Sequence, residues 1–145
     1  MKGLIAAHSG LRYIILLLVI IAVFNAYKGI KSGNYLKKDK MINLFAMIFL
    51  HIQLLLGLVL YFKSPKVQFG ADTMKEATLR FFTVEHTLLM LIAITVITLG
   101  RRKAENEVEI AKKHRTILRS YGLALIIIFL AIPWPFIYNV GAKYF

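Results

Sequence analysis

The residues of this chain best suited to chemistry are its four histidines, His8, His51, His86 and His114. Three of them lie within long apolar stretches, and His114 lies in a basic segment that leads into another. Ionisable side chains inside a membrane are costly and usually serve a function. Imidazole nitrogens are common ligands of transition metals and of haem iron. The chain has no cysteine, which excludes thiolate metal sites, iron–sulfur clusters and covalently attached c-type haem.

Four apolar stretches position these histidines, and each is long enough to cross a bilayer, which takes about 20 helical residues. The chain has 145 residues, the size of one domain, and 59% of them are hydrophobic, which is too apolar for a soluble domain. Backbone groups in lipid must be satisfied within their own segment, so we expect helices. We predict one all-α domain, a four-transmembrane-helix up-down bundle, with helices over residues 4–28, 41–62, 80–100 and 108–138.

The basic residues predict how this bundle is oriented. Twelve of them flank the first and third connections: Lys28, Lys31, Lys37, Lys38, Lys40, Arg101, Arg102, Lys103, Lys112, Lys113, Arg115 and Arg119. The other side carries six: Lys2, Lys63, Lys66, Lys75, Arg80 and Lys143. The positive-inside rule therefore predicts cytoplasmic first and third connections and both the N and C termini outside, with Trp134, Tyr138 and Tyr144 in an outer aromatic belt. Topology signals thus account for the net charge of +12 without nucleic-acid binding.

Two of the histidines are expected at the same depth. His8 lies six residues after Lys2, and His86 lies six residues after Arg80, which is about 9 Å along each helix. These two helices run in the same direction and are diagonal in an up-down bundle. Imidazoles that face each other across a bundle core can ligate one iron from both faces of a porphyrin. We therefore expect a haem b near the outer face, with His8 and His86 as its iron ligands.

Charged neighbours fit the same expected site. Arg12 is one turn after His8 and shares its helix face, so we expect it to pair with haem propionates or with Glu85. Arg80 is a further candidate for the propionates at the outer surface. His51 precedes Lys63 by twelve residues, about 18 Å, and lies deeper. The full set of expected cofactor-binding residues is His8, Arg12, His51, Arg80, Glu85 and His86.

Plainer interpretations of these residues stay open. His8 and His86 could be interfacial histidines that touch lipid headgroups. His51 is a core histidine bonded to a hydroxyl or amide, part of a quinone pocket or proton path, or a ligand of a second haem with His114. The basic surroundings of His114 favour a solvated or headgroup-facing side chain. Glu85 either pairs with Arg12 or handles protons.

Four short stretches carry a resemblance to a known family: His8-Ser9-Gly10-Leu11-Arg12, His51-Ile52-Gln53-Leu54-Leu55-Leu56-Gly57, Val84-Glu85-His86 and Ile132-Pro133-Trp134-Pro135-Phe136. Essentially the whole chain resembles a family of small four-helix membrane proteins of Bacteroidota identified as cytochrome B. It is more distantly similar to one four-helix half of haem A synthase, whose two haem-ligating histidines match His8 and His86 by position. The second half, the paired cysteines and the acidic residue ahead of the first histidine are missing here.

This resemblance implies a b-type haem, electron transfer and a multi-pass protein of the bacterial cytoplasmic (inner) membrane. A bis-histidine iron has no open position, which favours an electron-transfer protein or subunit over a stand-alone enzyme. Menaquinol is the natural donor or acceptor, and subunits of a respiratory or other membrane complex are natural partners beside the lipid bilayer. Two alternatives stay open: a cofactor-free accessory subunit of a larger membrane complex, and a haem A synthase-like enzyme. No nucleotide loop, zinc-protease helix, Ser/His/Asp arrangement or nucleic-acid motif is present.

Overall fold

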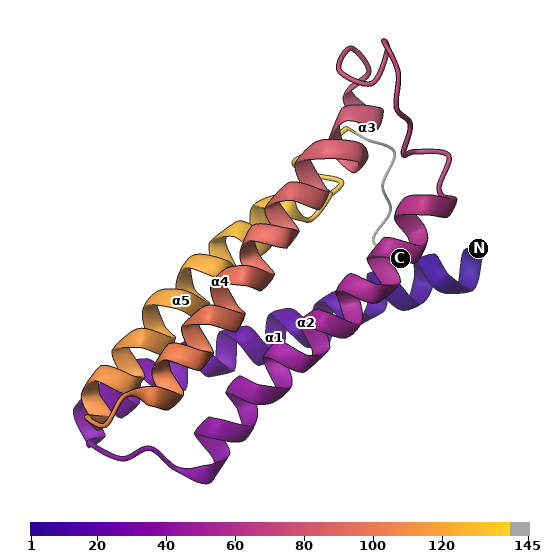
Figure 1. Ribbon diagram of the computed structural model, residues 1–145. Coiled ribbons are helices and arrows are strands. Elements are labelled where there is room, and N and C mark those ends of the chain that lie inside the picture. Colours follow the sequence, from indigo (N-terminus) through magenta and orange to yellow (C-terminus); the bar gives the residue numbers. More distant parts are fainter. Residues whose placement is uncertain (140–145) are drawn as a thin grey trace.

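The computed structural model describes residues 1–139, so Lys143 and Tyr144 lie outside the described residues. Over this range the chain is helical without strands, as predicted (Figure 1). Its elements are α1 (Lys2–Ser32), α2 (Lys37–Lys63), α3 (Ala77–Arg80), η1 (Phe81–Glu85), α4 (His86–Asn106) and α5 (Ile110–Ala131). The segments α3, η1 and α4 form one span, Ala77–Asn106, so four helices are long and apolar enough to cross a membrane.

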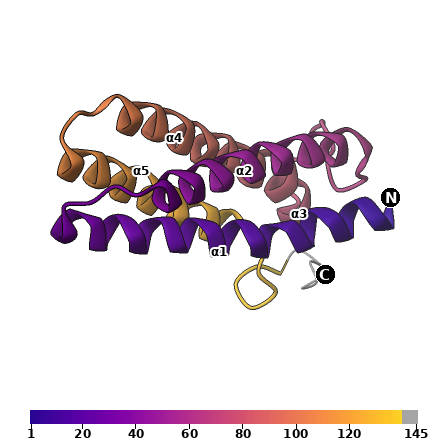
Figure 2. The ribbon, with the colours of Figure 1, turned by 90° about the horizontal axis from the view of Figure 1, so that it is seen from below.

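The helices pack as antiparallel neighbours, in the order of an up-down bundle. α1 packs against α2 and α5, α4 packs mainly against α5, and α2 contacts α4 least of the adjacent pairs. The views in Figures 1 and 2 show α1 beside α2 and α4 beside α5. α1 and α4 are therefore diagonal, as the sequence predicted. We call the end with residue 1, the loop 64–76 and residues 132–139 the Met1 end, and the end with the turns 33–36 and 107–109 the Gly33 end.

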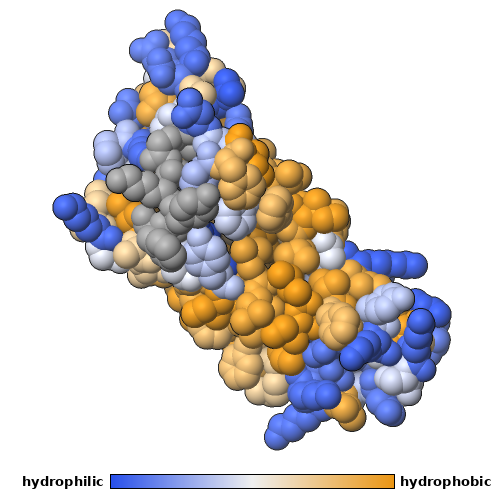
Figure 3. All heavy atoms as spheres, turned by 180° about the vertical axis from the view of Figure 1, so that it is seen from behind, coloured by the Kyte–Doolittle hydropathy of each residue, from blue (hydrophilic) through white to orange (hydrophobic). Residues whose placement is uncertain are grey.

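An apolar belt separates the two polar ends of the molecule. Figure 3 shows hydrophilic residues gathered at both ends and hydrophobic residues between them. Large apolar side chains such as Leu17, Leu55, Leu88 and Ile126 are exposed on this belt. Small residues are buried where helices meet: Ala22, Ala26, Ala46, Ala93, Ala104 and Ala124. Close approach at alanines and an apolar exterior are typical of helices packed within a bilayer, so the chain is a multi-pass membrane protein.

The observed spans differ from the predicted ones mainly at the last helix. α1, α2 and the third span extend by a few residues beyond the predicted limits. The fourth helix begins at Ile110 and ends at Ala131, not at residue 138 as predicted. Ile132 is extended at φ −73° and ψ 130° because the ring of Pro133 disfavours helical backbone in the residue before it. The apolar stretch therefore continues beyond the helix that it predicted.

His114 corrects one prediction directly, because it is buried and not solvated. Its side chain lies at the Gly33 end with 1% of its surface exposed. The imidazole Nε2 donates to the carbonyl of Asn34 at 2.7 Å, and the ring packs against Gly29. Gly29 leaves the space for this ring, since a Cβ there would overlap it. His114 thus connects α5 to the turn between α1 and α2, and its surrounding charges could not reveal this.

A second group of polar contacts joins α2 and α4 at the same end. The hydroxyl of Tyr35 donates to Glu105 at 2.8 Å and accepts from the amide of Asn43 at 3.3 Å. Lys40 pairs with the same carboxylate at 3.4 Å. Burial, and then the hydrogen bond to Glu105, raise the pKa of Tyr35 above its ordinary value, so this hydroxyl stays a donor. The Gly33 end is therefore closed by hydrogen bonds as well as by packing.

We expect Gly29→Ala to destabilise the bundle by about 1–3 kcal/mol, because the added methyl group forces the His114 ring out of its place. Gly122→Ala in α5 is the matched control. A Cβ at residue 122 meets nothing within 4 Å, so the better helix propensity of alanine leaves stability unchanged or raises it by up to about 1 kcal/mol. Thermal unfolding in detergent micelles measures both. Equal melting temperatures for the two variants would contradict the packing of His114 on Gly29.

Candidate functional site

A cavity of about 500 Å³ lies inside the bundle at the Met1 end. All four spans contribute to its wall, and the loop residues Ser64, Pro65, Lys66 and Val67 close it from the end. Most of the wall is apolar, with a few polar side chains from α1, α2 and α4. Such a cavity, apolar with a small number of converging polar groups, is typical of a site for a small molecule or cofactor.

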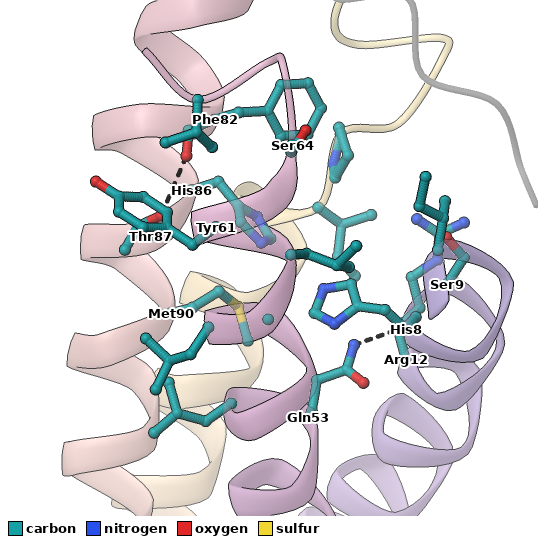
Figure 4. A pocket seen from close by; sticks show the side chains of 18 of the residues that line it. His8, Ser9, Arg12, Gln53, Tyr61, Ser64, Phe82, His86, Thr87 and Met90 are labelled. Atoms are coloured by element: carbon teal, nitrogen blue, oxygen red, sulfur yellow. Dashed lines mark hydrogen bonds between the residues drawn. The ribbon is translucent and has the colours of Figure 1, made fainter. Parts of the chain in front are cut away.

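His8 from α1 and His86 from α4 face each other in this cavity (Figure 4). Their ring centres are 6.3 Å apart and their ring planes are 71° apart. The structure therefore brings together the two histidines that counting along the helices put at one depth. Two imidazoles that ligate one metal ion from opposite sides have ring centres about 6 Å apart, since each metal–nitrogen bond is about 2 Å and the rest is ring.

A π-helical turn positions His86. In η1 the backbone N–H of His86 donates to the carbonyl of Phe81, five residues back. The carbonyls in this turn then take other donors: the Thr87 hydroxyl donates to Phe82 at 3.1 Å, and the Tyr61 hydroxyl of α2 donates to Thr83 at 3.0 Å. Such turns often occur at functional sites because one inserted residue turns the following side chain to a new direction. Here the following side chain is His86.

The end of α5 supplies the partner of His86. The last four carbonyls of a helix have no donor within that helix, and the prolines at positions 133 and 135 bring no N–H of their own. Each of these four carbonyls nevertheless has a donor. The Ile128 carbonyl accepts from the Ile132 N–H at 3.1 Å, and the Phe129 carbonyl accepts from the Trp134 indole at 2.9 Å. The Leu130 carbonyl accepts from the Tyr138 hydroxyl at 2.6 Å, and the Ala131 carbonyl accepts from the His86 imidazole at 2.7 Å. The imidazole of His86 therefore completes the cap of α5.

This hydrogen bond also decides which nitrogen of His86 is available. A carbonyl can only accept, so Nδ1 carries the proton and the neutral ring keeps its lone pair on Nε2. Histidines that ligate metals commonly have their other ring nitrogen bound to a carbonyl in this way, which sets the ring orientation. His86 is thus held in the tautomer and direction that ligation through Nε2 requires.

His8 is supported differently. Its ring lies against Gly57 of α2, where a Cβ would come within 3.2 Å of the ring carbon Cε1. The amide of Gln53 donates to the backbone carbonyl of His8 at 2.8 Å, which fixes the backbone of α1 at this point. The ring nitrogen Nδ1 is buried and has no hydrogen-bond partner within the described protein. Gly57 and Gln53 therefore make room for the ring and hold its backbone, but the buried Nδ1 of the ring has no hydrogen bond to any described residue.

The cations at the cavity are not all those that the sequence predicted. Arg12 lines the cavity, and its guanidinium lies 5.8 Å from the Trp134 ring. Lys66, which was not singled out, also lines it and lies over the ring of Phe82 at 5.0 Å. Arg80 instead binds Glu85 at 2.7 Å, and neither of these two side chains lines the cavity.

The expected pairing of Glu85 with Arg12 is therefore wrong, because Arg80 lies on the same helix only five residues away. Trp134 also differs from the expected belt, since it is 9% exposed and its indole caps α5. Lys66 could have been found from the sequence only as one of several lysines near Pro65. The turn that folds it over the cavity has no marked signature of its own.

His51 lies apart from the other expected site residues. It is exposed on the face where α2 and α4 meet, and it is not part of the cavity wall. Its Nδ1 donates to the Met47 carbonyl of its own helix at 2.8 Å, and its Nε2 lies 3.5 Å from the Thr98 hydroxyl. A role for His51 in a quinone pocket or in a second haem with His114 stays a prediction.

Comparisons with known proteins return nothing for this chain: no family model, no curated protein and no solved structure matches it. Within residues 1–139 there is also no group of three or more histidine, aspartate or glutamate side chains that could hold a metal ion. Within the described residues His8 and His86 are therefore a pair of facing histidines and not part of a larger cluster of this kind. Function has to be inferred from this pair and from the cavity around it.

We expect Gln53→Leu to lower the free energy of unfolding by about 0.5–2 kcal/mol, because the hydrogen bond that joins the buried Gln53 side chain of α2 to the His8 carbonyl of α1 is lost. Gln68→Leu is the matched control, since the amide of Gln68 is exposed and bonds only to the nearby Pro65 carbonyl. Unfolding of both variants in detergent measures the difference. If Gln53→Leu were as stable as Gln68→Leu, the contact between α1 and α2 would not contribute as we describe.

Proposed function

We propose that this chain is a b-type cytochrome embedded in the bacterial cytoplasmic membrane, with a haem b held between His8 and His86 and used for electron transfer near the outer face. The observation that carries the proposal is the pair of imidazoles 6.3 Å apart inside an apolar cavity. This separation matches two ligands of one iron. Interfacial histidines that only touched headgroups would have no need of a shared cavity.

The residues present fit a haem in three further respects. The cavity of about 500 Å³ has the size of a cofactor site. Gly57 leaves open the space beside the His8 ring, which any side chain would fill. Arg12 and Lys66 line the same cavity and are natural partners for two propionate groups, in place of the expected Arg80.

A bound haem would supply a one-electron couple at its iron. The protein's own contribution is to bind and orient. The Ala131 carbonyl holds His86 in the tautomer with a free Nε2, and a mostly apolar wall surrounds the two rings. A solid interior would have favoured a cofactor-free accessory subunit, so the cavity argues against that alternative. Menaquinol and partner subunits remain natural electron donors or acceptors, with His51 on the membrane-facing side of α2 and α4.

Orientation is part of the proposal and follows from charge. The Gly33 end carries most of the basic residues, so we assign it to the cytoplasm and the cavity to the outer side. Because the chain has no cysteine, single cysteines report position without background. We expect Gln68→Cys, at the Met1 end, to react with a membrane-impermeant maleimide in intact spheroplasts, and Lys103→Cys to react only after lysis. The reverse pattern would contradict the orientation.

We expect the purified protein to bind haem b at about one per chain and to give the reduced-minus-oxidised spectrum of a bis-histidine cytochrome. His8→Ala and His86→Ala should each abolish this six-coordinate spectrum, because each removes one ligand. His51→Ala is the matched control, since His51 lies outside the cavity and its removal should leave the spectrum unchanged. Unaltered spectra in both ligand variants, or a colourless protein supplied with haem, would remove the assignment.

A further inference from the structure

The two facing histidines are supported unequally, although their residue type and depth are the same. His86 is in the interior of the third span, and its ring is held by a 2.7 Å hydrogen bond to Ala131. The ring of His8 has no such bond, because its buried Nδ1 has no partner within the described protein. One ligand position is thus fixed in direction, and the other depends on packing alone.

The surroundings of His8 add a second, independent difference. His8 lies in the second turn of α1, and the residues before it are exposed apart from Leu4, which is partly exposed. A Cβ at Gly3 or Gly10 would meet nothing within 4 Å, so the face of α1 opposite His8 has no other part of the described protein packed against it at these two positions. Its firm attachment is the Gln53 contact to the backbone, which does not restrain the ring. No hydrogen bond of the buried Nδ1 within the described protein therefore has to break when the His8 side chain leaves the cavity.

We propose that His8 is an exchangeable ligand, that His86 is the permanent one, and that the His8 side of the cavity is a binding site for a small uncharged diatomic molecule such as CO. This rests on the proposed function, because the site exists only with haem present. Hydrogen-bonded partners of metal-bound histidines typically contribute 10- to 100-fold to metal affinity. A ligand that lacks such a partner is correspondingly easier to displace.

The class of ligand follows from the wall of the cavity on this side. The cavity wall includes the apolar residues Ile5, Leu54 and Ile132. Its larger polar side chains from α1 and α2 already have other roles, since the Gln53 amide donates to the His8 carbonyl and Arg12 is assigned to a propionate. A molecule that enters must fit the space that an imidazole vacates and must carry little hydration, since an apolar wall cannot replace lost water contacts. CO meets both conditions and serves as the probe.

The test uses purified holoprotein in detergent, reduced with dithionite and exposed to CO. We expect the wild type to give a CO difference spectrum and His8→Ala to give the same spectrum at lower CO concentration. We expect His8→Ala to keep its haem, with an affinity at least about 10-fold above that of His86→Ala. Added imidazole should restore the six-coordinate spectrum of His8→Ala. A wild type that holds haem and does not bind CO, or equal haem loss in the two variants, would overturn the proposal.

A pair of proline variants tests the anchor of His86 without replacing a ligand, in case His86→Ala does not fold. Pro133→Ala lets α5 continue, but Pro135 still has no N–H to offer to Ala131, so His86 keeps its carbonyl. The double variant with both Pro133→Ala and Pro135→Ala supplies that N–H, which then competes with the His86 imidazole for the Ala131 carbonyl. We expect haem affinity about 10-fold lower in the double variant than in the single one. Equal haem affinities in the two variants would show that the hydrogen bond to the Ala131 carbonyl does not make His86 a stronger ligand than His8.

Failure of this inference and failure of the proposed function give different results. A wild type that binds no haem overturns both. A wild type with a normal bis-histidine spectrum and no response to CO, or with His8→Ala as haem-free as His86→Ala, overturns only the inequality of the two ligands. Retained haem in His8→Ala, CO binding and imidazole rescue together support it.

Discussion

The Met1 end of this protein is organised by the need to satisfy the carbonyl groups where α5 ends. In a membrane protein an unsatisfied backbone group away from water costs several kcal/mol. This cost is a sizeable fraction of the free energy of unfolding of a typical protein. Pro133 ends the helix, and the carbonyls of residues 128–131 then take donors from a backbone amide, an indole, a phenol and an imidazole. The imidazole comes from another span, so this cap also fixes α4 in height and rotation against α5.

That cap has consequences for the cavity. The π-helical turn and the Ala131 bond together direct His86 inward, while Gly57 of α2 leaves room for the ring of His8. α2 and α4 touch least among the neighbouring helices, and the Tyr61 bond to the Thr83 carbonyl holds them together near the Met1 end. The Gly33 end is closed by Tyr35, Glu105 and His114 instead. The hydrogen bonds at the Gly33 end and the cap of α5 at the Met1 end thus hold the helices together around the cavity.

One alternative is that His86 serves only to cap α5, but the geometry of the site has features that a cap alone does not need. A cap needs only Nδ1 and its proton, and a lysine or a serine near a helix end could serve as well. It does not require a second histidine ring 6.3 Å away in the same cavity, nor a glycine beside that second ring. Cap and ligand are compatible in one residue because they use different nitrogens. The cap would also favour ligation, since it selects the tautomer with a free Nε2.

The sequence was a good guide wherever one helix could be considered by itself. Apolar length predicted the spans, and a fixed rise per residue predicted that His8 and His86 lie at one depth. It failed wherever the answer depended on a partner far along the chain. The Ala131 carbonyl has no signature in residue type, and the burial of His114 depends on Gly29 of another helix. The pair Arg80–Glu85 is a local exception, because its two residues are only five apart in the third span.

The same limit explains why the two histidines looked equivalent. Counting residues predicts the depth and the helix face of each histidine. The strength of a histidine ligand also depends on the partner of its second ring nitrogen. In His86 this partner is the Ala131 carbonyl, whereas the buried Nδ1 of His8 has no partner within the described residues. A bis-histidine site with two anchored rings would be closed to other ligands and suited only to electron transfer. With one ring anchored, as we propose here, a haem site would pass electrons and still admit a competing ligand. On the proposed function, the position of two prolines beyond α5 would therefore serve the site as well as the fold.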